Sequence, residues 1–106
     1  MNRSQMIALY NQDQRRNAIL PLMRREVAGS VVRHVDLSSV GEGIVLYSEL
    51  SAANADAAIR EQVHYFETIG QDFEWKLYDF DQPGDLKDRL ADHSFAIEEE
   101  EAFVVL

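Results

Sequence analysis

The sequence predicts a single α+β domain, and three observations point to this fold class. The 106 residues suffice for one domain with one hydrophobic core. Apolar residues recur at helical spacing in some segments, while other segments are short runs rich in β-branched and aromatic side chains. No internal repeat or low-complexity linker interrupts the chain, so we expect residues 1–106 to form one domain.

Two helices are expected before the first strand. Residues 4–18 predict the first helix, and Ser4 is suited to cap it. Its apolar side carries Met6, Ile7 and Tyr10. The middle of this segment, "NQDQRRN", is strongly polar, so we expect the helix to be peripheral. Pro21 fits the first turn of a short second helix over residues 21–26, because its missing N–H has no partner to lose there.

The rest of the chain predicts two further helices and four strands. The expected strands are residues 31–37, 43–50, 73–80 and 102–106, and the expected helices are residues 52–69 and a short segment that begins near Pro83. Ser51 can cap the long helix and Gly70 can end it. Its buried stripe is expected to hold Ala55, Ile59, Val63 and Phe66. The predicted order is therefore ααββαβαβ.

The acidic run from Glu98 to Glu101 stands directly before the apolar segment that ends the sequence. Four adjacent acids typically mark an exposed connection that keeps an apolar strand soluble. The alternative is a patch that binds a cation or a basic partner.

The charge is strongly negative and unevenly distributed. A net charge of −9 argues against nucleic acid as a main partner. Residues 1–33 hold six arginines and two acids, a net charge of +4, whereas residues 34–106 have a net charge of −13. The basic segment is either a solvated helix or an arm that docks on an acidic surface, its own or that of a partner subunit.

Composition also predicts where the protein resides. There is no cysteine for a disulfide or a thiolate metal site. No apolar stretch approaches the roughly 20 residues of a membrane span, and the first residues turn polar too early for a signal peptide. We therefore expect a cytoplasmic protein that has no membrane partner.

Several residue pairs are candidate sites, and most favour a structural role. Glu61 and His64 have the spacing of one half of a di-iron site, but the second copy is missing, so a solvated helix face and no metal are expected. His34 and Asp36 are expected as a surface pair, because no nucleophile accompanies them. The segment 41–43, "GEG", is expected in a hairpin turn rather than a phosphate loop.

Aromatic residues on the third expected strand offer a further choice. Trp75 and Tyr78 are suited to line a ligand cleft, although an aromatic residue on a half-buried strand is more often part of the core. We expect Trp75 in the core.

Five stretches carry a resemblance to a known family. They are "YNQDQRRNAILPLMRREV" (10–27), "VVRHV" (31–35), "GEGIVLYSEL" (41–50), "NADAAIREQVHYFETIGQDFEWKLYDFDQPGDLKDRL" (54–90) and "EEEEAFVVL" (98–106). Together they resemble the N-terminal region of a bacterial subgroup of the GNAT-family N-acetyltransferases. The resemblance implies an acetyltransferase-like, mixed and mostly antiparallel sheet with helices packed on it. The segment 73–90 would correspond to the fifth strand and fourth helix of that fold.

The sequence departs from the family at the end of that helix and at the cofactor site. The helix usually ends in Gly-Phe, where this chain has Ser94 and Phe95. The family binds the pyrophosphate of acetyl-CoA with a Gln/Arg-x-x-Gly-x-Gly/Ala turn that leads into the central helix. The corresponding segment, "ELSAANADAAIREQ", has no glycine and no Arg or Gln at the required place. Ser51 and Asp56 suit a helix start without a bound anion, so no cofactor contact is assigned to any residue.

The resemblance therefore leads to three functional hypotheses. The first is an acetyltransferase-related module that is non-catalytic alone and acts in dimerisation or substrate contact. The second is an enzyme that transfers acetyl from acetyl-CoA to a small amine, with a site completed across a homodimer and Tyr47, Glu49 or Tyr78 as acid or base. The third is an unrelated domain that binds a small ligand or a protein. The expected dimer interface is the apolar segment formed by Phe103, Val104, Val105 and Leu106.

Overall fold

The structure is a computed structural model that describes residues 2–38, 41–78, 80–96, 98–100 and 103–105. The elements in chain order are α1 (Arg3–Tyr10), η1 (Asn11–Arg16), β1 (Met23–Ala28), β2 (Val31–Asp36), β3 (Gly43–Ser48), α2 (Ala55–Ile69), β4 (Phe73–Tyr78), α3 (Leu86–Asp92), β5 (Glu98–Glu100) and β6 (Phe103–Val105). The predicted α+β class is confirmed.

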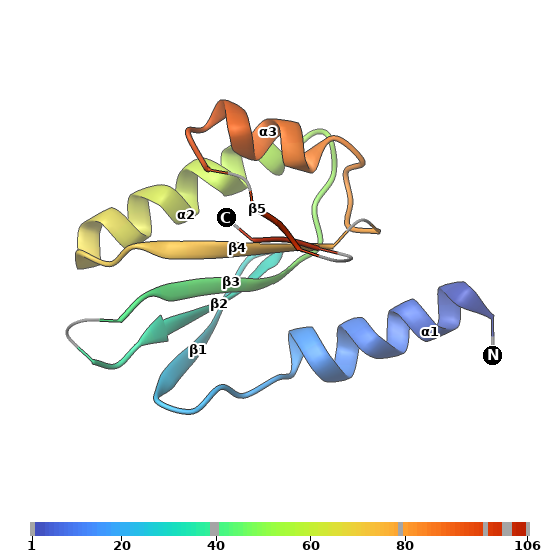
Figure 1. Cartoon of the computed structure of the whole chain (residues 1–106), viewed down its shortest axis with the longest axis horizontal. Coiled ribbons are helices and arrows are strands. Elements are labelled where there is room, and N and C mark those ends of the chain that lie inside the picture. The colour runs from blue at the N-terminus through green and yellow to red at the C-terminus, as the bar shows by residue number, and fades with distance from the viewer. Residues whose placement is uncertain (1, 39–40, 79, 97, 101–102, 106) are drawn as a thin grey trace.

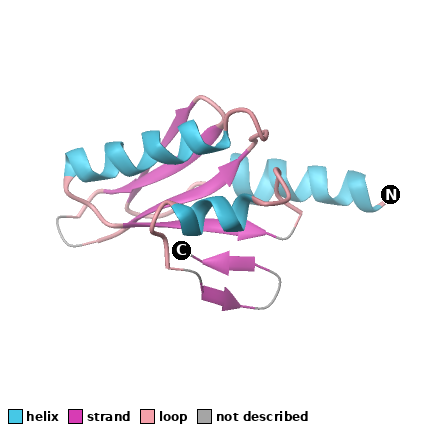
Figure 2. Ribbon diagram, turned by 90° about the horizontal axis from the view of Figure 1, so that it is seen from above, coloured by secondary structure: helices cyan, strands magenta, loops and turns pink. Residues whose placement is uncertain are grey.

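The strands form one mixed sheet in the order β1-β2-β3-β4-β6-β5. All neighbours are antiparallel except β3 and β4, which run parallel and are connected by α2. Figure 1 shows α2 and α3 above the sheet, while α1 lies on the other side and projects beyond it. Figure 2 shows the same arrangement from above, with the N-terminal helix extending past the strands.

The predicted order of elements is wrong in two places. Residues 21–26 are not a helix, since Met23–Ala28 forms β1 and pairs with β2 along its whole length. The hairpin between them turns at Gly29, whose φ of +60° is easily reached by glycine. Pairing with β2 outweighs the preference of Pro21 for the first turn of a helix. Pro21 itself lies just outside the strand. Glu98–Glu100 also forms a strand, β5, rather than a connection.

The first helix docks through a different side from the predicted one. It begins at Arg3 behind an Asn2 cap, not at a Ser4 cap, and continues through η1 as a π-helix. The expected apolar residues Met6 and Tyr10 are 58% and 40% exposed. Toward the sheet lie the half-buried Ile7 and Asn11, followed by the buried Arg15.

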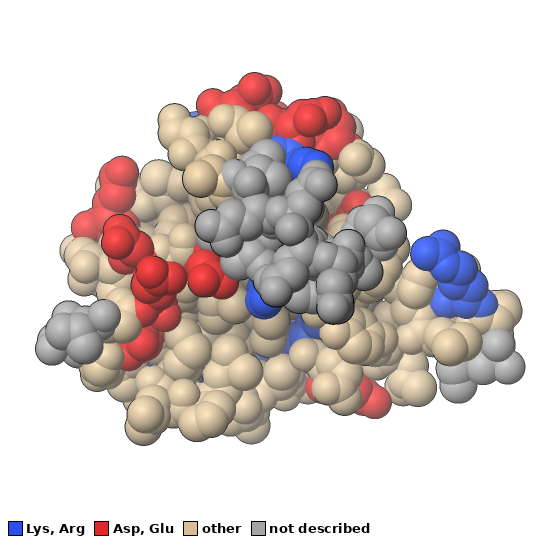
Figure 3. All heavy atoms as spheres, viewed as in Figure 1, with Lys and Arg blue, Asp and Glu red and all other residues tan. Residues whose placement is uncertain are grey.

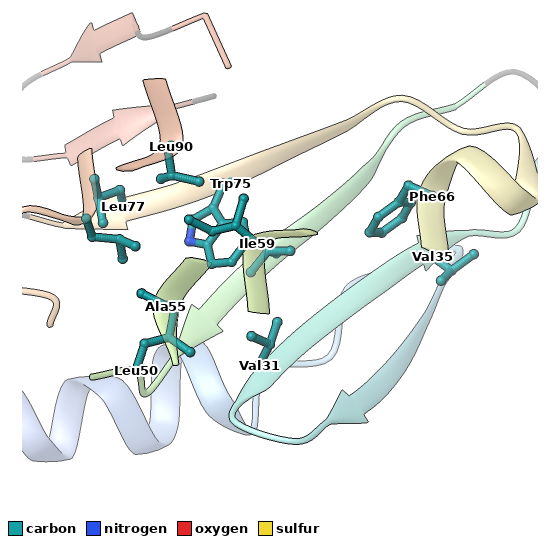
Figure 4. Close-up of a cluster of buried hydrophobic side chains, with 11 residues drawn as sticks. Val31, Val35, Leu50, Ala55, Ile59, Phe66, Trp75, Leu77 and Leu90 are labelled. Atoms are coloured by element: carbon teal, nitrogen blue, oxygen red, sulfur yellow. The ribbon is translucent and has the colours of Figure 1, made fainter. Parts of the chain in front are cut away.

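The hydrophobic core lies between the sheet and the α2–α3 layer (Figure 4). Helix α2 buries three of the four predicted residues: Ala55, Ile59 and Phe66. The fourth, Val63, is half-buried and packs against the core. The helix also buries Gln62, whose side-chain oxygen accepts a hydrogen bond from Arg33 at 3.2 Å. Trp75 is completely buried in this core, as expected.

The end of the sheet near the C-terminal segment bears on the predicted interface. Strand β6 is paired on both sides, with β4 and with β5, so the outer edge here belongs to Glu98–Glu100. Leu106, Ala102 and Glu101 lie outside the described residues. An interface at Phe103–Leu106 stays a prediction.

Candidate functional site: a socket for Arg15

A β-bulge in β3 decides which side chains face the N-terminal helix. Val32 pairs with Tyr47 and the next residue, Arg33, pairs with Val45, so Leu46 is an extra residue in β3. Val45 lies in the core beneath α2. Because the bulge reverses the alternation of side chains, Tyr47 lies on the opposite face, where the α1–η1 helix packs.

The same bulge lies where β3 and β4 separate. Their parallel ladder runs from Gly43 and Phe73 to Val45 and Trp75 and continues no further in either strand. The carbonyl groups of the next residues therefore face an opening between the carboxyl ends of two parallel strands. In open mixed sheets, such an opening is a typical place for a ligand.

The side chain of Arg15 fills this opening. Its Nε donates a hydrogen bond to the Leu46 carbonyl oxygen at 3.0 Å, and its Nη2 donates to the Lys76 carbonyl oxygen at 3.4 Å. Arg15 is fully buried although it carries a permanent charge. It therefore links the two separated strands from the helix side of the sheet.

A carboxylate balances the buried charge. Asp81 accepts two hydrogen bonds from Arg15, from Nη1 at 2.6 Å and from Nη2 at 2.9 Å. Asn11 accepts another from Nη1 at 3.0 Å. All five N–H donors of the guanidinium thus have an acceptor. The backbone N–H of Tyr78 donates to Asp81 at 3.0 Å and holds this carboxylate in place.

Two aromatic rings complete the surroundings of the guanidinium. Its carbon lies 4.3 Å from the ring centre of Tyr78 and 5.4 Å from that of Tyr47, both within the range of a cation–π contact. Tyr78 also shares a 2.8 Å hydrogen bond between hydroxyl groups with Tyr10 of α1. We call the groups that the sheet side offers to Arg15 the Arg15 socket: the carbonyl oxygens of Leu46 and Lys76, the rings of Tyr47 and Tyr78, and the carboxylate of Asp81.

The tyrosines in the socket are poor candidates for a general base. Burial and the hydrogen bond to Tyr10 raise the pKa of Tyr78 to about 12. Burial, with a further contribution from the negative charge of Glu49, also raises the pKa of Tyr47. Both phenols therefore keep their protons near neutral pH.

A groove of about 690 Å³ runs between the N-terminal helix and β3, next to the socket. Its lining comprises Ser4, Ile7, Ala8, Asn11, Gln12, Arg16, Tyr47, Glu49 and Phe80. The structure thus brings together two of the three predicted acid or base candidates, Tyr47 and Glu49. The third, Tyr78, contacts Arg15 and Tyr10 instead.

The start of α2 differs from the predicted cap. Asn54 precedes the helix, and its side-chain oxygen accepts the backbone N–H of Ser51 at 2.8 Å. Asp56, in the first turn, accepts hydrogen bonds from His93 at 3.2 Å and from Arg89 at 2.6 Å. The hydrogen bond with His93 is the main cause that lowers the pKa of Asp56, and the contacts with Arg89 lower it further. A carboxylate fixed in the first turn does not favour a bound anion at the start of this helix.

The remaining predicted pairs lie apart from this site. His34 is not on the surface: it is fully buried, because both faces of β2 are covered along much of its length. Neither His34 ring nitrogen has a hydrogen-bond partner among the described residues, and Asp36 accepts a hydrogen bond from the backbone N–H of Ser38 instead. Glu61 and His64 are exposed on α2 as expected.

The described ranges lack the features of two other kinds of site. Nowhere in them do three His, Cys, Asp or Glu side chains gather as metal ligands would. Among the same residues, none of the helices combines the length and the apolar character that a membrane span requires.

Sequence reasoning missed both Arg15 and its charge partner in the socket, Asp81. Arg15 lies in the polar stretch that predicted a peripheral helix, and Asp81 lies in a turn near a proline. Their spacing of 66 residues leaves no local signal. The one hint was the opposite charge of the two parts of the chain, which left docking of the basic segment on an acidic surface as one of two alternatives. Arg15 and Asp81 are one basic and one acidic residue of those two parts in contact.

No family model, no curated protein and no solved structure matches this chain. The structural evidence on function therefore comes from the geometry of the socket.

Proposed function

We propose that the chain is a non-catalytic module related to GNAT-family N-acetyltransferases that acts in dimerisation or substrate contact. The sequence resemblance extends over nearly the whole chain. The mixed, mostly antiparallel sheet supports it, as does the passage from β4 to α3 within the most similar segment. In this proposal the protein works in the cytoplasm as a homodimer.

The filled opening between β3 and β4 is the observation that carries the non-catalytic part of the proposal. A ligand that used the carboxyl ends of these strands would have to displace Arg15 from five acceptors. It would also leave the Asp81 carboxylate buried without its partner, which is strongly unfavourable. The paired Asp56 at the start of α2 adds a second obstacle to an anionic cofactor.

The groove beside β3 favours a second candidate function, an acetyl-CoA-dependent N-acetyltransferase completed across a dimer. Glu49 is exposed on its wall, and a carboxylate there suits a small amine as substrate. With both tyrosines protonated, Glu49 is the strongest candidate for a base. A ligand-binding or protein-binding domain without relation to acetyl transfer is the third alternative.

Calorimetric titration of acetyl-CoA into the purified chain tests the proposal. We expect no binding up to millimolar ligand. Micromolar binding would refute the non-catalytic proposal and favour the enzyme. In that case Glu49→Gln, compared with Glu42→Gln as a control outside the groove, should abolish transfer to amines while binding of acetyl-CoA persists.

A further inference from the structure

We propose that the α1–η1 helix is exchanged between two copies of the chain, so that Arg15 of each copy occupies the Arg15 socket of the other. This inference specifies the dimer in the proposed function. It does not depend on any relation to acetyltransferases, because it rests on the socket, the helix and the segment between them.

The helix is attached to the rest of the chain through few buried groups. No residue of α1 is buried, and Arg15 is the only buried residue of η1. In both ribbon views the helix extends beyond the sheet (Figures 1 and 2). Because one side chain supplies the main anchor, all of its contacts can be re-formed with the socket of a second copy.

The segment between the helix and β1 is short and exposed. Its last part is a turn over residues 20–23, closed by a hydrogen bond from the Met23 N–H to the Leu20 carbonyl oxygen at 3.3 Å, with Leu22 at a φ of +61°. The Leu22 carbonyl oxygen also accepts the Leu37 N–H at 3.1 Å, so this turn belongs to the sheet side of the molecule. Residues 17–19 are therefore the part that can extend toward a second copy, and Ile19 is 83% exposed. Short hinge loops favour exchange between identical chains.

Charge and apolar surface both favour a second copy as the occupant. Residues 1–22, which contain the helix, have a net charge of +2, and residues 23–106 have a net charge of −11. Figure 3 shows acidic side chains over α3 and along the side of the molecule away from the projecting helix, and a basic group near the end of that helix. On α1, Met6 and Leu9 are 58% and 50% exposed. Two copies can bury this apolar surface while their opposite charges guide association.

Reversal of the ion pair gives a test that distinguishes exchange from closure. Arg15→Asp and Asp81→Arg each place like charges together within one chain. In a mixture of the two variants, exchange brings the introduced aspartate of one chain against the introduced arginine of the other. The second socket of the same dimer then holds the original pair, Arg15 with Asp81.

We expect each variant alone to be monomeric or unstable, and the mixture to give a heterodimer by native mass spectrometry. The double variant Arg15→Asp/Asp81→Arg is the control, because it restores opposite charges within one chain. No rescue on mixing, with this double variant folded, would overturn the proposal.

Cross-linking provides a test that leaves the buried pair intact. The Tyr10 and Tyr78 hydroxyls lie 2.8 Å apart, and the chain has no natural cysteine. A short bis-maleimide should therefore join Tyr10→Cys to Tyr78→Cys. Exchange predicts covalent dimers on a denaturing gel, whereas closure predicts links within one chain. Links within one chain at every protein concentration up to millimolar would refute exchange. This outcome does not depend on whether the charge-reversal variants fold.

Discussion

Arg15 and Asp81, 66 positions apart in the sequence, form a buried two-point ion pair with N–O distances of 2.6 and 2.9 Å. This pair joins the N-terminal helix to the turn after β4 and closes the gap between β3 and β4. A buried ion pair fixes the relative position of its two elements, but it adds little net stability, because the cost of desolvating both charges offsets much of their attraction. Loss of one partner is different, since it leaves an uncompensated charge in the interior.

Arg15→Ala should therefore lower the free energy of unfolding by about 3–5 kcal/mol. The loss comes from the unpaired Asp81 carboxylate and from the Leu46 carbonyl oxygen, which loses the hydrogen bond from Nε. Urea denaturation measures it. Arg16→Ala is the matched control, because Arg16 carries the same side chain one position on and lines the open groove. Similar losses for the two variants would contradict a special role of the buried pair.

Replacement of both partners should be far milder. Arg15→Met combined with Asp81→Leu removes both charges and fills the opening with apolar groups. We expect a loss clearly smaller than that of Arg15→Ala in the same urea titration, since neither charge is left buried alone. If the double replacement is as harmful as the single one, the polar contacts to Leu46 and Lys76 matter more than the charge balance.

His34 should make the protein less stable in mild acid. It is fully buried, and neither ring nitrogen has a hydrogen-bond partner within the described part of the chain. Burial, with repulsion from Arg25, lowers the pKa of His34 below its usual 6.5. As the pH falls through that usual value, the unfolded chain takes up a proton that the folded chain resists, so the free energy of unfolding decreases.

His34→Phe should flatten this dependence by up to one proton between about pH 7 and pH 5. Urea denaturation at several pH values gives the slope. His64→Phe is the control, because it makes the same replacement at an exposed histidine. A wild-type slope in His34→Phe would show that other groups cause the acid sensitivity.

Two helices end in the same backbone turn with different residues in the left-handed position. Gly70 after α2 and Ser94 after α3 both have a φ of +71°. In each turn the following N–H donates back into the helix, from Gln71 to Phe66 and from Phe95 to Leu90. The resemblance to the acetyltransferases implies glycine at the second site, and serine takes the glycine conformation there.

Ser94→Gly should therefore stabilise the protein by about 1 kcal/mol, and Gly70→Ser should destabilise it by a similar amount. No atom lies within 4 Å of an added Cβ at Gly70, so the effect reports the backbone alone. Thermal unfolding of both variants measures the two shifts. Changes of the same sign would exclude this explanation.

Gly43 is required by packing rather than by backbone conformation. A Cβ at this position would collide with the Phe66 ring. Gly43→Ala should thus cost about 1–3 kcal/mol in the free energy of unfolding, measured by urea denaturation. Gly84→Ala, where an added Cβ meets open space, should cost little. A loss at Gly84 equal to that at Gly43 would rule out the collision as the cause.

The sequence alone determined the elements whose pattern is local. The strands over residues 31–37, 43–50 and 73–80 and the helix over residues 52–69 agree with β2, β3, β4 and α2 apart from their ends. Each combines a clear period of apolar residues with a turn signal at its boundary. The buried faces of α2 and β4 follow from the same period, which is why Ile59, Phe66 and Trp75 could be assigned to the core.

Only the tertiary structure decided the features that depend on distant partners. Residues 23–28 are a strand because β2 offers its edge, and Tyr47 faces the N-terminal helix because the bulge at Leu46 reverses the alternation. Arg15 is buried because Asp81 and two separated strands meet it there. From any short stretch of sequence, a charged side chain is predicted to be exposed. Whether its burial is favourable depends on a partner that only the folded chain brings within hydrogen-bond distance.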